Sequence, residues 1–190
     1  TYNYWKDIQN ALTPPDEDIG QNTDSDRSVY GLTFNHIFND DFSLTFIPSL
    51  YLSYWDDDSE IRNRSNSKLY RSEIRTNIRY SDDLNFITGT ELQYSNVNSN
   101  IFGNTFSNGI GIYTQADYKP IDKINLSLGL RYDYSKLENL NATQSISPKL
   151  GLTYQLSPRT LLRGLVSKGF RAPSLAEAFT STTSAGITVK

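Results

Sequence analysis

The chain has 190 residues with 18 basic and 21 acidic side chains, a net charge of −3, and no cysteine or methionine. A charge this balanced gives no indication of nucleic-acid binding. The absence of cysteine excludes thiol nucleophiles and cysteine-based zinc sites. The 13 tyrosines, 9 phenylalanines and 2 tryptophans favour strands over helices.

Apolar residues recur at every second position over segments of about ten residues, which is the pattern of membrane β-strands. In each segment the more apolar face is the one with even numbers, as Leu126, Leu128 and Leu130 illustrate. In chain order, the predicted strands are 29–38, 42–55, 69–80, 84–95, 109–118, 124–134, 146–156 and 161–168.

The connections between these strands alternate between short and long. The short ones, at 39–41, 81–83, 119–122 and 157–159, consist largely of Asn, Asp, Ser and Pro, which favour tight turns. The long ones, at 56–68, 96–108 and 135–145, are rich in Asn, Ser and Asp. Outer-membrane barrels have short periplasmic turns and long extracellular loops, so the pattern predicts this orientation.

The charged residues inside the predicted strands provide an independent check on the two faces. An Arg or Lys that faces lipid near the midplane costs about 2–4 kcal/mol. Charges should therefore avoid the even positions, and only Lys168, at a strand end, departs from this rule. The odd-numbered ones are Arg71, Glu73, Arg75, Arg79, Glu91, Asp117, Arg131, Asp133, Lys149 and Arg163.

Two motifs near the C-terminus follow one another in a fixed order. Ser147-Pro148-Lys149-Leu150-Gly151-Leu152 begins one strand, and Gly169-Phe170-Arg171-Ala172-Pro173-Ser174-Leu175-Ala176-Glu177 follows the next. Together they resemble the barrel signature of TonB-dependent outer-membrane receptors. The resemblance predicts an all-β chain: about eight consecutive strands of an antiparallel transmembrane β-barrel that has 22 strands in full.

The resemblance implies that residues 1–190 are part of the receptor's barrel domain. Residues 1–27 would form an extracellular loop, 28–169 the strands and loops, and 170–190 the next extracellular loop. Receptors of this family lie in the bacterial outer membrane, in contact with its lipid. They import a scarce nutrient, most often a ferric siderophore and otherwise haem or cobalamin. A plug domain blocks the pore, and TonB acts on that plug.

Two groups of side chains are candidate site residues. Aromatic rings offer contact area and arginines offer forked hydrogen bonds, which suits a large anionic or aromatic ligand. The alternative for the arginines is pairing with acids on the plug or a neighbouring strand. The ligand-binding candidates are Trp5, Tyr51, Trp55, Arg71, Tyr113 and Arg131. The plug-facing candidates are Glu73, Arg75, Arg79 and Glu91.

Asp56-Asp57-Asp58 at a strand end could contribute oxygen ligands to a structural calcium ion, although the surrounding sequence lacks an EF-hand pattern. No other cofactor is expected. The single histidine, His36, and the absence of nucleophile or nucleotide motifs predict that the protein is not an enzyme.

Two other architectures fit the alternation. One is a complete eight-stranded outer-membrane barrel with an adhesin-type or porin-type role, which would close into a ring. The other is a soluble ligand-binding β-barrel, in which the even-numbered residues would point inward.

Overall fold

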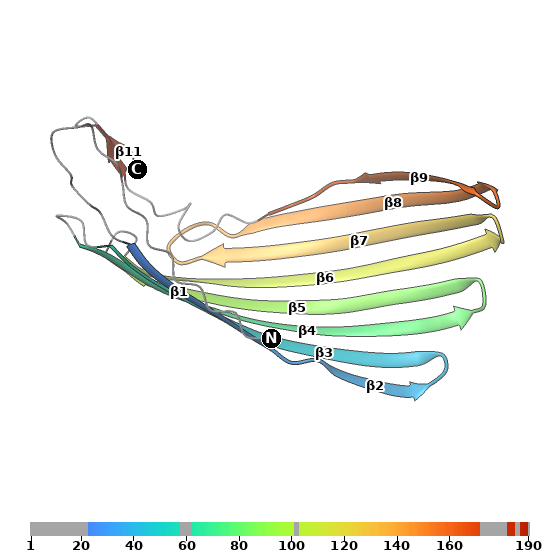
Figure 1. Cartoon of the computed structure of the whole chain (residues 1–190), viewed down its shortest axis with the longest axis horizontal. Coiled ribbons are helices and arrows are strands. Elements are labelled where there is room, and N and C mark those ends of the chain that lie inside the picture. Colours follow the sequence, from blue (N-terminus) through green and yellow to red (C-terminus); the bar gives the residue numbers. More distant parts are fainter. Residues whose placement is uncertain (1–22, 58–61, 101–102, 172–181, 185–186, 190) are drawn as a thin grey trace.

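A computed structural model describes residues 23–57, 62–100, 103–171, 182–184 and 187–189. The strands β1 to β9 form one antiparallel sheet of nine strands, and β10 and β11 form a separate pair (Figure 1). None of the described residues belongs to a helix long and apolar enough to cross a membrane.

Consecutive strands of the large sheet pair with one another, as the succession of predicted strands and short turns in the sequence indicates. The sheet follows the order β1-β3-β4-β5-β6-β7-β8-β9, with β2 also paired to β3. Their bounds are β1 Thr23–Gly31, β2 Phe34–Asn39, β3 Phe42–Asp57, β4 Asn63–Ser81, β5 Leu84–Ser99, β6 Gly103–Ile121, β7 Ile124–Leu137, β8 Thr143–Ser157, β9 Thr160–Ser167, β10 Thr182–Ser184 and β11 Ile187–Val189.

The first predicted strand, 29–38, is interrupted. β1 pairs with the second half of β3 and β2 with the first half, so the two pieces lie end to end along one edge. At the break, the Leu32 backbone N–H donates to the Pro48 carbonyl at 3.1 Å. The ladder therefore keeps a hydrogen bond on either side of Thr33.

The strands extend further into the predicted long loops than the apolar pattern indicates. β4 begins at Asn63 instead of residue 69, and β6 begins at Gly103 instead of residue 109. The predicted limits of the loops were wrong here because backbone pairing continues through polar residues, where alternation of apolar side chains has stopped. β1 starts inside the predicted loop 1–27, and β10 and β11 lie inside the predicted loop 170–190.

Three of the short turns lie where they were predicted, whereas β6 continues to Ile121, so the turn predicted at 119–122 lies at 122–123. Each of the four turns is accompanied by a shift in register. Such shifts occur at 37–39, 79–81, 118–121 and 155–157. In the first turn the Asp41 N–H donates to the Asn39 side-chain oxygen at 2.9 Å, the local bond that makes Asn a favourable turn residue. We call this end of the sheet the turn end and the opposite end the loop end.

The sheet is curved, and odd-numbered side chains occupy its concave face. Side chains on this face reach across an intervening strand, as Tyr113 on β6 does to Glu73 on β4 and Lys149 on β8 does to Gln115 on β6. Such contacts require side chains that converge, which only the concave side of a sheet provides.

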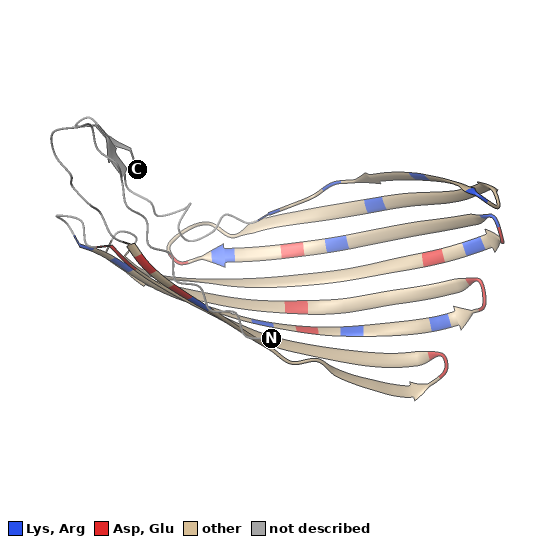
Figure 2. Cartoon of the chain, in the orientation of Figure 1, with Lys and Arg blue, Asp and Glu red and all other residues tan. Residues whose placement is uncertain are grey.

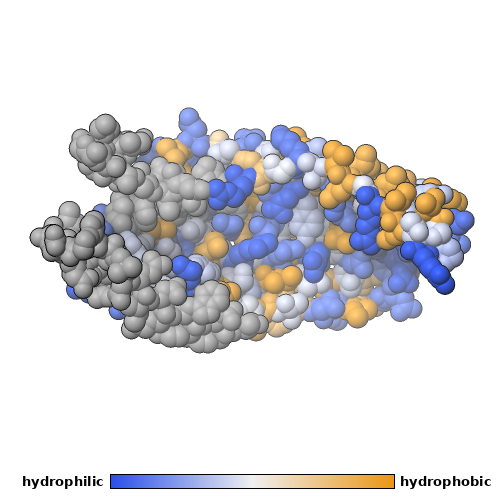
Figure 3. Space-filling model, turned by 45° about the horizontal axis from the view of Figure 1, so that its top comes forward, coloured by the Kyte–Doolittle hydropathy of each residue, from blue (hydrophilic) through white to orange (hydrophobic). Residues whose placement is uncertain are grey.

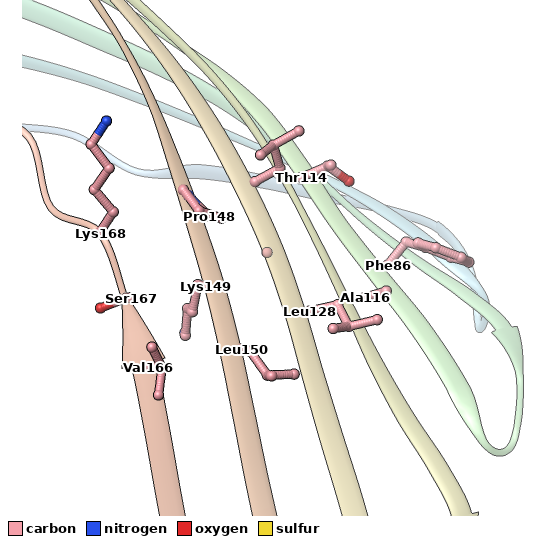
Figure 4. Close-up of a pocket in the computed structure, with 12 residues that line it drawn as sticks. Phe86, Thr114, Ala116, Leu128, Pro148, Lys149, Leu150, Val166, Ser167 and Lys168 are labelled. Atoms are coloured by element: carbon pink, nitrogen blue, oxygen red, sulfur yellow. The ribbon is translucent and has the colours of Figure 1, made fainter.

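The even-numbered side chains form the outward face. Leu92 and Leu128 are 52% and 56% exposed, so they fill no core. One outward-facing row, Phe86, Ala116, Leu128, Leu150 and Val166, borders a hollow of about 810 Å³ where Ala116 is small (Figure 4). Apolar atoms gather toward the turn end in the view of Figure 3. This orientation contradicts the soluble barrel, which needs these residues inside.

The large sheet is an open arc in the described part of the chain. No strand pairing there joins β9 to β1 or β2. The arc agrees with a segment of a larger barrel and does not support a closed eight-stranded ring.

Candidate functional site on the concave face

Two glutamates lie side by side in the middle of the concave wall. Glu73 on β4 is registered directly opposite Glu91 on β5. Like charges opposite one another on neighbouring strands destabilise a sheet. The pair therefore requires nearby cations or hydrogen-bond donors, and Lys and Arg residues lie on the surrounding strands (Figure 2).

Two arginines compensate this pair of carboxylates. Arg71 on β4 forms an ion pair with Glu91 and lies 3.8 Å from Glu73. Arg131 on β7 reaches over β6, placing Nη2 3.5 Å from Glu91 Oε1 and 2.8 Å from Asp133 Oδ1. The Glu91 side chain is 13% exposed whereas Arg71 is 48% exposed, so the arginines cover the acids and face the interior of the arc.

Tyr113 provides the remaining donor. Its hydroxyl donates to Glu73 Oε1 at 2.5 Å, and its ring lies 5.8 Å from the Arg131 guanidinium carbon. The ring passes over Gly89, where an added Cβ would be 2.5 Å from Tyr113 Oη and 2.8 Å from the Ile74 carbonyl oxygen. Gly89 is therefore required by the close approach of Tyr113.

Arg131 depends on a glycine in the same way. An added Cβ at Gly111 would overlap the Arg131 guanidinium and would lie 3.1 Å from Asp133 Oδ1. We call Arg71, Glu73, Glu91, Tyr113, Arg131 and Asp133 the central network. Its three acids and two arginines leave one net negative charge.

A second polar group lies nearer the turn end. Asp117 accepts hydrogen bonds from Ser127 and from the Gln115 amide, at 2.9 Å for the nearer Gln115 contact, and Lys149 Nζ donates to Gln115 at 3.2 Å. A hollow of about 390 Å³ lies against both groups, bordered by Glu73, Tyr113, Gln115, Arg131 and Lys149. The buried Ser147 hydroxyl at this hollow has no hydrogen-bond partner among the described residues.

Comparison with known proteins agrees with this architecture. The family described as "TonB dependent receptor-like, beta-barrel" matches residues 1–189. The chain belongs to the TonB-dependent receptor family. Members of that family are outer-membrane transporters, and the resemblance seen in the two C-terminal motifs is thereby confirmed.

Among solved structures, the receptor chain is similar to the FrpB iron transporter from Neisseria meningitidis (F3-3 variant), with a TM-score of 0.65 and 12% identity. The match covers 74% of this chain and 27% of that transporter. At this identity the likeness shows the fold alone, and the chain spans about a quarter of the transporter's length. No curated protein matches the chain at a significant level.

The structure merges the two predicted groups of receptor residues. Arg71, Tyr113 and Arg131, predicted as ligand-binding, contact Glu73 and Glu91, predicted as plug-facing. For the arginines this is the predicted alternative, pairing with acids on a neighbouring strand. Arg75 and Arg79 share the concave face nearer the turn end, and the described residues give neither of them an ion pair.

Two other predicted aromatic residues, Tyr51 and Trp55, lie apart from the central network. Tyr51 pairs with Leu69, which lies two residues from Arg71 toward the loop end. Trp55 pairs with Ser65 near the end of β3. Trp5 lies outside the described residues. Asp133, Gln115, Asp117 and Lys149 were not predicted as site residues, although all four have the odd parity of the concave face.

The aspartates predicted to hold calcium do not converge in the described residues. Asp56 faces outward and Asp57 inward, and Asp58 lies outside the described residues. Asp56 is instead held by Arg62, whose hydrogen bonds, with another from Tyr54, lower the pKa of Asp56 well below its ordinary value. The described residues contain no group of three or more His, Cys, Asp or Glu arranged to hold a metal.

Proposed function

We propose that the chain is part of the wall of a receptor that imports a scarce nutrient across the bacterial outer membrane with energy supplied through TonB. The transported ligand is a ferric siderophore, with haem and cobalamin as the alternatives. Family membership supports the importer, and the similarity to an iron transporter favours an iron chelate.

The observation that carries this proposal is the opposite chemistry of the two faces. Outward-facing leucines suit lipid acyl chains, and outward-facing tyrosines suit the membrane–water interface. The inward face carries ion-paired side chains, which need an interior filled with water or protein. Strands such as β3, with 16 residues, and β4, with 19, exceed the 9–11 residues needed to cross a bilayer. The additional length extends the wall beyond the membrane at the loop end.

The central network suits contact with a plug domain. Glu73 and Glu91 present two adjacent carboxylates whose wall partners are half-exposed arginines, so a basic group on the plug could join or replace those partners. Arg75 and Arg79, nearer the turn end, would face acids of the same domain. TonB would act through that plug.

Ligand capture is proposed nearer the loop end. Tyr51 and Trp55 line the concave face there, and Trp5 precedes the same strands in sequence. Arg71 and Arg131 would contribute positive charge at the turn-end side of this region, because their guanidinium groups face the interior of the arc.

The proposal is tested by deleting the full-length gene and growing the strain on single ferric siderophores, haem or cobalamin. Growth on one source should fail and should return with the intact gene. Retained growth on every source would exclude nutrient import by this receptor.

The plug contact has a separate test in the complemented strain. Replacing both glutamates (Glu73→Gln with Glu91→Gln) should loosen the plug and sensitise cells to large hydrophilic antibiotics. Glu138→Gln, at the turn that follows β7, is the matched control. Equal antibiotic sensitivity of the two variants would show that Glu73 and Glu91 do not contact the plug.

A further inference from the structure

A small polar cavity lies on the concave face, on the loop-end side of the central network. It encloses about 140 Å³ over β5, β6 and β7. Two consecutive rows of registered residues cross these strands here, each with a glycine on β6 between longer side chains on β5 and β7. The rows are Glu91, Gly111, Asp133 and Gln93, Gly109, Ser135. All six have odd numbers, so the cavity is a trough along β6 that opens into the arc.

The two glycines of this trough have different causes. Gly111 is required by the close approach of Arg131. At Gly109 an added Cβ would lie 3.6 Å from the Gln93 Cβ and 3.7 Å from the Tyr134 carbonyl oxygen, which are ordinary contacts. Packing within the wall therefore accepts a larger residue at position 109. A glycine inside a strand often marks a place where another part of the chain or a ligand approaches closely.

The residue that approaches this trough is Phe170, which borders the same cavity. β9 is the last strand of the sheet (Figure 1). Its ladder with β8 ends where Ser167 pairs with Lys149, and the Lys168 N–H donates to the Pro148 carbonyl at 3.0 Å. The nearest strand of the trough, β7, is two strands from β9, or about 10 Å at ordinary strand spacing. The chain therefore leaves the sheet after Lys168 and turns inward past β8.

Burial changes at the same point of the chain. Every residue of β9 is exposed, and so are Lys168 and Gly169, whereas Phe170 is half-buried. This half-buried position agrees with its place beside the trough, where an aromatic side chain is partly removed from water.

Arg131 is the cation that this arrangement covers. It borders the cavity, whereas Arg71 lies on β4, outside the lining. Arg131 is 35% exposed and Arg71 is 48% exposed, although both have Glu91 as a partner. The more covered arginine is therefore the one beside Phe170.

We propose that Phe170 caps this cavity and limits access to Arg131 from the interior of the arc. With the ring in place, Arg131 stays with Glu91 and Asp133, and an incoming anion reaches its guanidinium group only when the ring moves aside. This movement breaks no bond of the ladder, because Phe170 lies beyond the Lys168 hydrogen bond. The inference rests on the proposed function, in which Arg131 contributes to ligand capture, and it assigns the regulation of that contribution.

The position of the cap is tested in the purified full-length receptor in detergent, with the photo-cross-linking residue p-benzoylphenylalanine in place of Phe170. Cross-links mapped by mass spectrometry should fall within 107–111 and 133–135. The same substitution at Val166, on the outward face of β9, should give none there. Gly109→Leu fills the trough and should abolish these cross-links, whereas Gly31→Leu, at an open position of the same face, should not. Cross-links confined to β8, or unchanged by Gly109→Leu, would overturn the proposal.

Access to Arg131 is measured with phenylglyoxal, a neutral reagent that modifies exposed arginines. Phe170→Ala removes a half-buried ring and should speed the modification of Arg131 about fivefold, the ratio that corresponds to about 1 kcal/mol. Phe170→Leu should restore most of the protection, and Arg71 in the same molecule should react at an unchanged rate. An unchanged rate at Arg131, or an equal rise at Arg71, would contradict the cap. Neither measurement uses a nutrient, so a failure of the import proposal leaves both results intact.

Discussion

Tyr113 and Glu73 are joined by a 2.5 Å hydrogen bond that spans the whole width of β5, passing over Gly89. A contact between side chains on strands that are not neighbours depends on the curvature of the wall. It couples β4 to β6 and fixes the orientation of one member of the glutamate pair.

The first prediction concerns the glycine beneath this contact. In the full-length receptor, Gly89→Ala should destabilise the barrel by about 1–3 kcal/mol, because the new methyl group meets the Ile74 backbone as well as Tyr113. Urea unfolding in detergent measures the effect. Gly164→Ala, where the added carbon meets nothing within 4 Å, is the control. Equal stability of the two variants would contradict the packing described for Gly89.

The second prediction concerns the coupling of Arg71 and Glu91. Because Arg71 is half exposed, the interaction should be worth only about 0.5–1 kcal/mol. A double-mutant cycle with Arg71→Gln and Glu91→Gln measures this coupling by urea unfolding. A cycle between Arg163→Gln and Glu91→Gln, whose residues have no ion pair with each other, should give a coupling near zero. If both cycles gave the same value, the central network would not be an energetic unit.

The third prediction tests the two faces directly. Leu128→Arg places a charge on the outward face and should cost about 2–4 kcal/mol near the midplane, impairing assembly in the outer membrane. Ser127→Arg places the same group beside Asp117 on the concave face, where it gains a partner. The amount of folded receptor, measured by heat-modifiable gel migration, should fall only for Leu128→Arg. Equal loss would mean that the faces are assigned wrongly.

The fourth prediction concerns pH at the loop end. The pKa of Asp56 is lowered, first by the Arg62 hydrogen bonds, so its ion pair stabilises the folded state above the ordinary carboxyl pKa of about 3.9 and is lost as pH falls below it. Amide protection factors in β3 and β4 near Asp56 should be unchanged between pH 7 and 5 and should fall on further acidification. Arg62→Gln should move this loss to higher pH, and an unchanged profile would argue against the Asp56–Arg62 pair.

The sequence alone determined which face each strand residue occupies. A strand places successive side chains on opposite sides, so parity by itself separates the leucines at 126, 128 and 130 from the charges at 71, 73 and 91. The short turns followed from their Asn, Asp and Pro content. The two C-terminal motifs identified the family, and the family match confirms it.

Only the tertiary structure decided how those residues combine. Which side chains become neighbours depends on strand register, and the shift at 79–81 moves that register between β4 and β5. Contacts such as Arg131 with Glu91 depend further on curvature, which brings side chains on alternate strands together. Alternation indicates a face but carries no information about register or curvature, so the pairing of Arg71 and Arg131 with wall carboxylates became visible only in the folded sheet.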